Sequence, residues 1–181
     1  MSEIRNIINA KQSVLIFDVD GVLAIMEFGL NTHFLDDDSW KKTLLNDINL
    51  YDKDKVSKKL QLLINKKDKN RIFVITKVDD IVEINQKKEY VNKYYGIIKE
   101  NVYCVNTDSE KTKELEKIKS KFKGLDSKYF VMIDDTVEVL NDAMNNNKIS
   151  TAHISTFIDM WFVAYYKIYL MQRRYRCIVK R

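Results

Sequence analysis

Short apolar runs rich in β-branched residues alternate with longer amphipathic segments along most of the chain. The apolar runs cover residues 14–17, 71–76, 101–106, 129–133 and 149–155. Gly96 and Gly124 each follow an amphipathic segment, where a helix C-cap is expected. This alternation predicts an α/β fold with a five-stranded parallel sheet and helices on both faces. Between the runs, apolar residues recur at helical spacing, at Val56, Leu60, Leu63 and Ile64, at Ile81, Ile84, Val91 and Tyr95, at Leu115, Ile118 and Phe122, and at Val137, Leu140 and Met144.

Residues 26–53 interrupt this alternation directly after the first apolar run. A strand is normally followed by its crossover helix within a few residues, so the segment predicts a small insertion over the carboxyl end of the first strand. Such an insertion can act as a cap or flap over a site. The alternative is a longer first crossover with one extra helix near residues 40–48.

Length and composition favour one domain, because 181 residues with 45% hydrophobic content bury one core and are few for two. We assign this domain to residues 1–156. Residues 157–181 are predicted to form a final amphipathic helix, aromatic on one side and basic on the other, that packs on the same domain.

The net charge of +5 belongs to the end of the chain. Residues 160–181 contain six basic residues and no acid, so the remaining chain has a net charge of −1. This distribution argues against a nucleic-acid-binding domain body. Contact of the tail with nucleic acid or an anionic membrane surface is an alternative that is not favoured over its packing on the domain.

The expected location is cytoplasmic. Cys104 and Cys177 show no CxxC spacing, and the first ten residues lack the apolar core of a signal peptide. Asp159 and Lys167 interrupt the most apolar segment, so no transmembrane segment is predicted.

Two aspartates, Asp18 and Asp20, lie within the apolar stretch VLIFDVDGVL. In a strand, residues two positions apart project to the same side, so the two carboxylates point together and raise each other's pKa. Their repulsion has to be offset by a bound cation, by solvation at the surface, or by a reaction that uses two adjacent acids.

Polar residues follow the other predicted strands as well. Because ligands of open α/β sheets bind beyond the carboxyl ends of the strands, these residues are the candidates for a site. They are Asp18 and Asp20 with Gly21 in the turn, Thr76, then Asp108, Ser109 and Lys111, and finally Asp134 and Asp135.

This ordered set resembles the haloacid dehalogenase-like superfamily of phosphotransferases. The signature of that superfamily is DxDG[TV] after the first strand, Ser or Thr after the second, Lys before the fourth, and an acidic pair after the fourth. The resemblance covers roughly residues 12–155 and implies a three-layer Rossmann-like fold with strand order 3-2-1-4-5.

The resemblance also implies a Mg²⁺ cofactor. Asp18 is the implied nucleophile and a metal ligand, Asp20 contributes its backbone carbonyl to the metal, and Asp134 is a third ligand. Asp135 lies beside them as a ligand or as a residue that supports the ligands. A carboxylate is a weak nucleophile, so phosphoryl transfer to it requires this neutralisation of charge.

Three more side chains receive roles from the same resemblance. The carboxyl of Asp20 is the implied acid and base, which protonates the leaving oxygen and later activates water. Thr76 and Lys111 are the implied partners of the phosphoryl oxygens. Lys113 is the alternative to Lys111.

The expected function is therefore that of a Mg²⁺-dependent phosphomonoesterase with an aspartyl-phosphate intermediate. The wording DGVLA looks like that of small deoxyribonucleotidases and of the phosphatase domains of polynucleotide kinases. The expected substrate is a nucleoside monophosphate or another small phosphorylated metabolite, with polynucleotide ends as an alternative. The oligomeric state is left open.

Two other classes of protein are alternatives to this expectation. A signalling receiver domain places its acidic pair after the first strand and its phosphoacceptor after the third, whereas the third predicted strand here ends in Asn106. A binding or scaffold protein with the same fold and little turnover is the second alternative.

Overall fold

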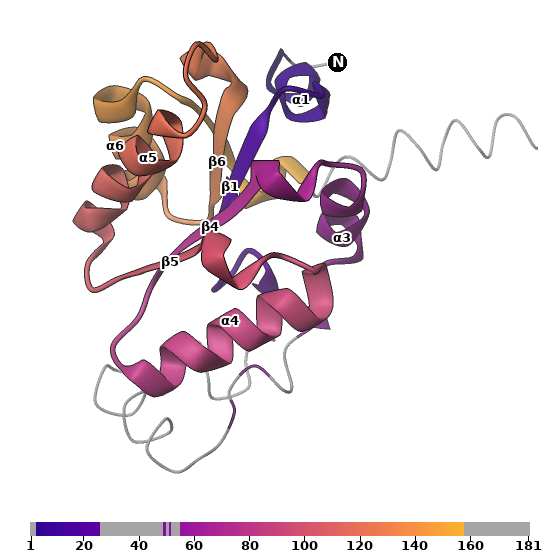
Figure 1. The fold of residues 1–181 in the computed structure, drawn as a ribbon, viewed down its shortest axis with the longest axis vertical. Helices are drawn as coiled ribbons and strands as arrows, with labels where there is room; N and C mark the ends of the chain where they lie inside the picture. Colours follow the sequence, from indigo (N-terminus) through magenta and orange to yellow (C-terminus); the bar gives the residue numbers. More distant parts are fainter. Residues whose placement is uncertain (1–2, 26–48, 50, 52–54, 158–181) are drawn as a thin grey trace, which may run out of the picture.

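The computed structural model describes residues 3–25, 49, 51 and 55–157. Its centre is a five-stranded sheet in which every neighbouring pair of strands is parallel. The strands are β1 (Val14–Phe17), β4 (Ile72–Lys77), β5 (Val102–Val105), β6 (Phe130–Asp134) and β7 (Ser150–His153). Their order across the sheet is β5-β4-β1-β6-β7, so β1 lies in the middle (Figure 1). The predicted α/β class with a parallel sheet is confirmed.

Helices cover both faces of the sheet. Side chains from α1 (Glu3–Asn9), α3 (Lys58–Asn65) and α4 (Ile81–Tyr95) pack in one hydrophobic cluster with Leu15 and Phe17 of β1. Side chains from α5 (Lys111–Ser120) and α6 (Val137–Asn147) pack in a second cluster with Val14 and Ile16. Successive residues of a strand point to opposite faces, so the four apolar residues of β1 supply both cores.

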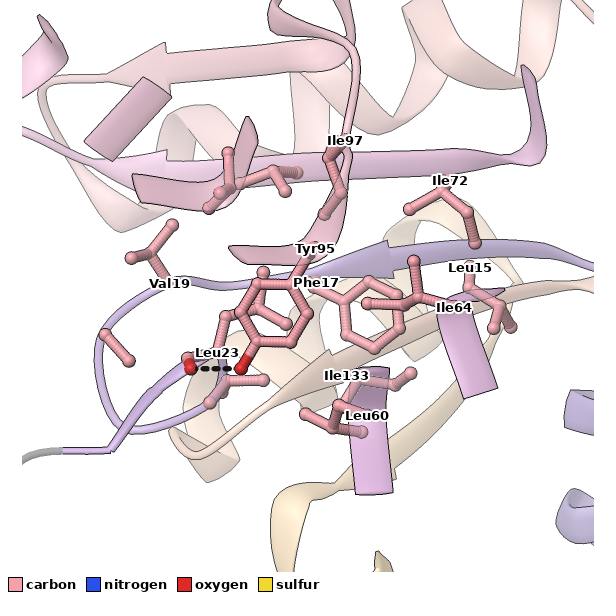
Figure 2. Close-up of a cluster of buried hydrophobic side chains, with 14 of the residues drawn as sticks. Leu15, Phe17, Val19, Leu23, Leu60, Ile64, Ile72, Tyr95, Ile97 and Ile133 are labelled. Carbon is pink, nitrogen blue, oxygen red and sulfur yellow. Dashed lines mark hydrogen bonds between the residues drawn. The ribbon is translucent and has the colours of Figure 1, made fainter. Parts of the chain in front are cut away.

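The turn after β1 is tied to helix α4. Figure 2 shows Tyr95, at the end of α4, beside Phe17, Val19 and Leu23 in the first cluster, and its hydroxyl donates to the carbonyl oxygen of Leu23 at 2.5 Å. The hydroxyl of Tyr95 also accepts from the backbone N–H of Ser57, which caps α3, at 2.9 Å. Burial raises the pKa of Tyr95 to about 12, so its hydroxyl stays protonated and able to donate at neutral pH.

A two-stranded antiparallel ribbon joins the chain on either side of the predicted insertion. Its strands are β2 (Ala24–Ile25) and β3 (Lys55–Val56). The segment between them therefore leaves and rejoins the domain at neighbouring positions. Most of this segment, which carries the predicted cap, lies outside the described residues, as does the predicted final helix beyond Phe157.

Two local predictions need correction. Val56 was predicted on the apolar stripe of a helix but lies in β3, and the helix begins at Lys58 after the Ser57 cap. Gly96 caps α4 in the left-handed conformation as predicted, whereas α5 ends at Ser120 with Lys121 as its cap, so Gly124 lies in the turn beyond. Among the described helices, none combines the length and the apolar content that crossing a bilayer requires.

Candidate functional site

Three carboxylates gather where two central strands end. Asp18 directly follows β1, and its backbone N–H donates to the carbonyl of Ile133 in β6 at 3.0 Å, which extends the pairing of the two strands. Asp134 ends β6, and Asp135 follows it. One oxygen from each of Asp18, Asp134 and Asp135 lies within 4.8 Å of the other two. The topology thus brings together acids that are far apart in the sequence.

The acidic cluster of Asp18, Asp134 and Asp135 is largely shielded from solvent. Asp134 is fully buried and Asp18 is 7% exposed, whereas Asp135 is exposed. The pKa of Asp18 is raised to about 7, chiefly by burial and also by the carboxylates of Asp134 and Asp20, against the opposing effect of the Lys111 ammonium. Without a cation the ionised form of Asp18 is therefore costly.

One oxygen of Asp18 shows how the acidic cluster can be completed. Asp18 Oδ1 is buried and has no hydrogen-bond donor among the described residues; the ammonium of Lys111 lies 3.5 Å away. A buried carboxylate oxygen without a donor is unfavourable unless a cation binds it. Three carboxylates supply hard oxygen ligands, the type that Mg²⁺ prefers, so the residues present fit a magnesium ion.

Lys111 is the lysine that lies at this cluster. It is 3% exposed at the start of α5, and its ammonium lies 3.1 Å from Asp134 Oδ2 and 3.0 Å from Asp108 Oδ1. Burial by itself lowers the pKa of Lys111, but Asp18, Asp134 and Asp108 together raise it above its ordinary value, so this lysine is charged at neutral pH. The alternative, Lys113, is exposed on the same helix.

The turn after β5 places Lys111. The Glu110 carboxylate accepts from the backbone N–H of Asn106 at 2.9 Å, and Thr107 and Glu110 form a reciprocal capping box before the helix. Helix α5 therefore begins with Lys111 pointing toward the ends of β1 and β6. The position of Lys111 beside the acidic cluster therefore depends on the order of the strands as much as on the local sequence.

Gly21 allows the turn after β1 to approach the acidic cluster. Its φ of +69° lies in the left-handed region, and a Cβ added there would lie 2.1 Å from Asp135 Oδ2. Both the backbone conformation and the close approach therefore require glycine. The backbone carbonyl of Asp135 accepts from Nε2 of His153 at 3.0 Å, and this hydrogen bond holds the loop after β6.

We predict that Gly21→Ala lowers the free energy of unfolding by about 1–3 kcal/mol and also weakens any effect of Mg²⁺ on stability. The added methyl group strains the turn and displaces the Asp135 carboxylate. Gly124→Ala is the matched control, because Gly124 also has a positive φ, +83°, but nothing lies within 4 Å of an added Cβ. Urea unfolding with and without Mg²⁺ measures both variants, and equal losses in the two would contradict the role given to the close approach.

Asp20 is held apart from the acidic cluster. Its Oδ2 lies 2.6 Å from the ammonium of Lys87, and its Oδ1 accepts from the hydroxyl of Tyr51 at 3.0 Å. The described cluster of potential metal ligands contains the side chains of Asp18, Asp134 and Asp135 and not that of Asp20. The predicted contribution of Asp20 to the metal, which was through its backbone carbonyl, stays a prediction.

Thr76 lies at the end of β4, fully buried. Its hydroxyl accepts from the ammonium of Lys87 at 3.2 Å. Thr76 is therefore linked to Asp20 through Lys87. Its predicted contact with phosphoryl oxygens stays a prediction.

Lys87 was missed by the sequence analysis. It is 1% exposed on α4 and also forms an ion pair with Glu83, four residues earlier, at 2.9 Å. A signal was present, because Glu83 and Lys87 share a helical stripe with Val91 and Tyr95 that faces the sheet. The chain has 31 lysine and arginine residues, so its sequence alone does not distinguish one buried lysine from the exposed ones.

The charges of the whole site favour a cation. The formal charge is −4 when every group is ionised. A divalent cation halves this charge. The groups are Asp18, Asp20, Glu83, Asp108, Asp134 and Asp135, opposed by Lys87 and Lys111.

Comparisons with protein-family models and with curated protein sequences give no match. Among solved structures, the chain is similar to one described as "Structure of DsGPDH of Dunaliella salina", with 18% sequence identity and a TM-score of 0.47. The match covers 78% of this chain and spans 23% of the length of that chain. Similarity at this level says nothing about activity.

Proposed function

We propose that the protein is a Mg²⁺-dependent phosphomonoesterase that forms an aspartyl-phosphate on Asp18. The observation that carries the proposal is the buried Asp18 carboxylate, with one oxygen lacking a hydrogen bond, beside two further carboxylates and the Lys111 ammonium. Such a site binds a cation and an anionic group next to a carboxylate nucleophile. The strand order β5-β4-β1-β6-β7 agrees with the order implied by the haloacid dehalogenase-like resemblance and supports the proposal.

Asp18, Asp134 and Asp135 are the side chains that would hold Mg²⁺. When bound, the cation neutralises the negative charge on the nucleophile and on the phosphoryl oxygens. Lys111 adds a fixed positive charge on the same side, since its ammonium already lies between Asp18, Asp108 and Asp134. These charges lower the repulsion between a carboxylate and an anionic phosphate ester.

The reaction takes place in two steps. A carboxylate oxygen of Asp18 attacks phosphorus and forms an acyl-phosphate bond, while the bond from phosphorus to the ester oxygen breaks and Asp20 gives its proton to that oxygen. Asp20 then takes a proton from water, which attacks phosphorus, releases inorganic phosphate and restores the Asp18 carboxylate. An acid two residues after the nucleophile favours hydrolysis over a long-lived phosphoenzyme.

The proposed substrates are nucleoside monophosphates and other small phosphorylated metabolites, with 3′- or 5′-phosphorylated oligonucleotides as the alternative. Release of inorganic phosphate from a panel of all three, with Mg²⁺ and with excess EDTA, tests the proposal. Hydrolysis of at least one substrate in Mg²⁺ and none in EDTA is the expected result. A folded protein that binds Mg²⁺ but turns over none of the panel would favour the scaffold alternative.

A further inference from the structure

Lys87 is a buried cation at the edge of the proposed active site and has no role in the reaction as described. Its ammonium lies 2.6 Å from Asp20 Oδ2, 2.9 Å from Glu83 Oε1 and 3.2 Å from Thr76 Oγ1, and it also donates to the carbonyl of Lys77. A buried ammonium is tolerated only with such compensation. All of its partners are oxygen atoms, and they come from the turn after β1, from β4 and from α4.

The contact with Asp20 is not needed for the helix that carries Lys87. Within α4, Lys87 pairs with Glu83, which accepts in turn from the backbone N–H of Asp79 at 2.7 Å. That local network would be complete without Asp20, which belongs to the turn after β1. The ammonium nevertheless approaches Asp20 more closely than it approaches Glu83 or Thr76.

Both carboxylate oxygens of Asp20 contact residues from outside its own turn. Lys87 holds Oδ2 and the hydroxyl of Tyr51 holds Oδ1. The Asp20 side chain is still 35% exposed, so it is fixed in direction while open to a substrate. A carboxyl group that transfers a proton to a leaving oxygen has to be held in this way, since misplacement by about 1 Å can cost about 10²-fold in rate.

We propose that Lys87 is a positioning residue that fixes the Asp20 carboxyl group for proton transfer to the leaving oxygen and joins it to Thr76 at the neighbouring strand end. The inference rests on the proposed phosphatase function. Lys87 itself forms and breaks no bond: the proton passes from the Asp20 carboxyl to the ester oxygen as its bond to phosphorus breaks. The role of the buried Lys87 ammonium, at a position where an apolar residue is usual, is therefore to orient Asp20.

The test compares leaving groups. The alkoxide that leaves an alkyl phosphate needs a proton on its oxygen, whereas the p-nitrophenolate that leaves p-nitrophenyl phosphate departs readily without one. In Lys87→Met, kcat/KM for an alkyl phosphate is expected to fall about 10- to 100-fold more than kcat/KM for p-nitrophenyl phosphate. This parameter reports the steps up to departure of the alcohol, so later hydrolysis of the phosphoenzyme does not hide the effect.

A second variant keeps the test valid if Lys87→Met alone does not fold. Glu83→Gln/Lys87→Met removes the helical ion pair as a unit and leaves no unpaired Glu83 carboxylate. Lys88→Met, at the next and half-buried lysine of α4, is the matched control and is expected to treat both substrates as the parent does. A melting-temperature rise with Mg²⁺ in each variant checks that the metal ligands are intact.

The outcomes separate the two proposals. The alkyl phosphate is the best substrate of the panel described above, and a parent protein that hydrolyses no member of that panel and no p-nitrophenyl phosphate overturns the phosphatase function. A parent that is active, with folded Lys87 variants that lose activity equally on both substrates or on neither, overturns the positioning role and leaves the function in place. A selective loss on the alkyl phosphate, absent in Lys88→Met, supports both.

Discussion

Replacing Asp18 by asparagine is expected to abolish phosphate release, with a fall in kcat of about 10³-fold or more. The amide has nearly the shape of the carboxylate but is not a nucleophile toward phosphorus, so the aspartyl-phosphate cannot form. The fold is expected to remain, because the change removes a buried negative charge from beside Asp134. Phosphate release and the melting temperature are measured on the same preparation.

The matched control is Asp142→Asn, at an exposed position of α6. It makes the same chemical change away from the site and is expected to leave turnover unaltered. A folded Asp18→Asn protein that releases phosphate at the parent's rate would show that Asp18 is not the nucleophile. In that case the proposed mechanism fails even if the protein proves to be a phosphatase.

Mg²⁺ is expected to stabilise the parent against unfolding and to lose this effect in Asp134→Asn. A ligand that binds only the folded state adds about 2.7 kcal/mol to its stability at one hundred times the dissociation constant. Asparagine keeps an oxygen that can accept from the backbone N–H of Thr136, the donor that bonds Asp134 Oδ1 at 2.9 Å, but it removes the charge. Melting curves at several Mg²⁺ concentrations measure the affinity of each protein.

The expected loss of affinity exceeds the roughly 10- to 100-fold that removal of an outer partner of a metal ligand costs. Asp126→Asn is the control, because Asp126 is exposed and lies before β6, outside the acidic cluster. An equal Mg²⁺ effect in the parent and in Asp134→Asn would refute the metal site. So would the absence of any effect in the parent.

The same measurement has a predicted pH dependence. The pKa of Asp18 is raised from 3.8 to about 7 by burial, so between these values the folded protein holds a proton that the unfolded chain has lost. The contribution of Asp18 to the stability of the metal-free protein therefore falls as the pH rises from about 4 to about 7. Stabilisation by Mg²⁺ is expected to grow over the same interval, because the metal binds the ionised carboxylate.

The class of fold was predictable from the sequence because its signals are local. The strands β1, β4, β5 and β6 are short, largely apolar runs, and the α-helices described after β3 carry apolar stripes. The polar residues that end β1 and β6 were predictable for the same reason, since parallel strands place their carboxyl ends at one edge of a sheet. Asp18 and Asp134 could therefore be assigned to one site without any knowledge of distances.

The ribbon of β2 and β3 was not predictable in this way. Each of its strands has two residues, too few to show a period. Val56 was placed on a helical stripe because its spacing to Leu60 and Leu63 fits one. The pairing of Val56 with Ala24, across a long stretch of chain, decides the matter instead.

The contacts between side chains in the site could not be predicted from the sequence. The sequence alone determined the α/β class and the acids at the strand ends, because local apolar patterns fix strands and parallel strands share an edge. Only the tertiary structure decided that Lys111 rather than Lys113 meets Asp18, and that Lys87 and Tyr51 hold Asp20. The direction in which a lysine or tyrosine points is set by how its element packs on the sheet, and neighbouring residues in the sequence carry little information about that packing.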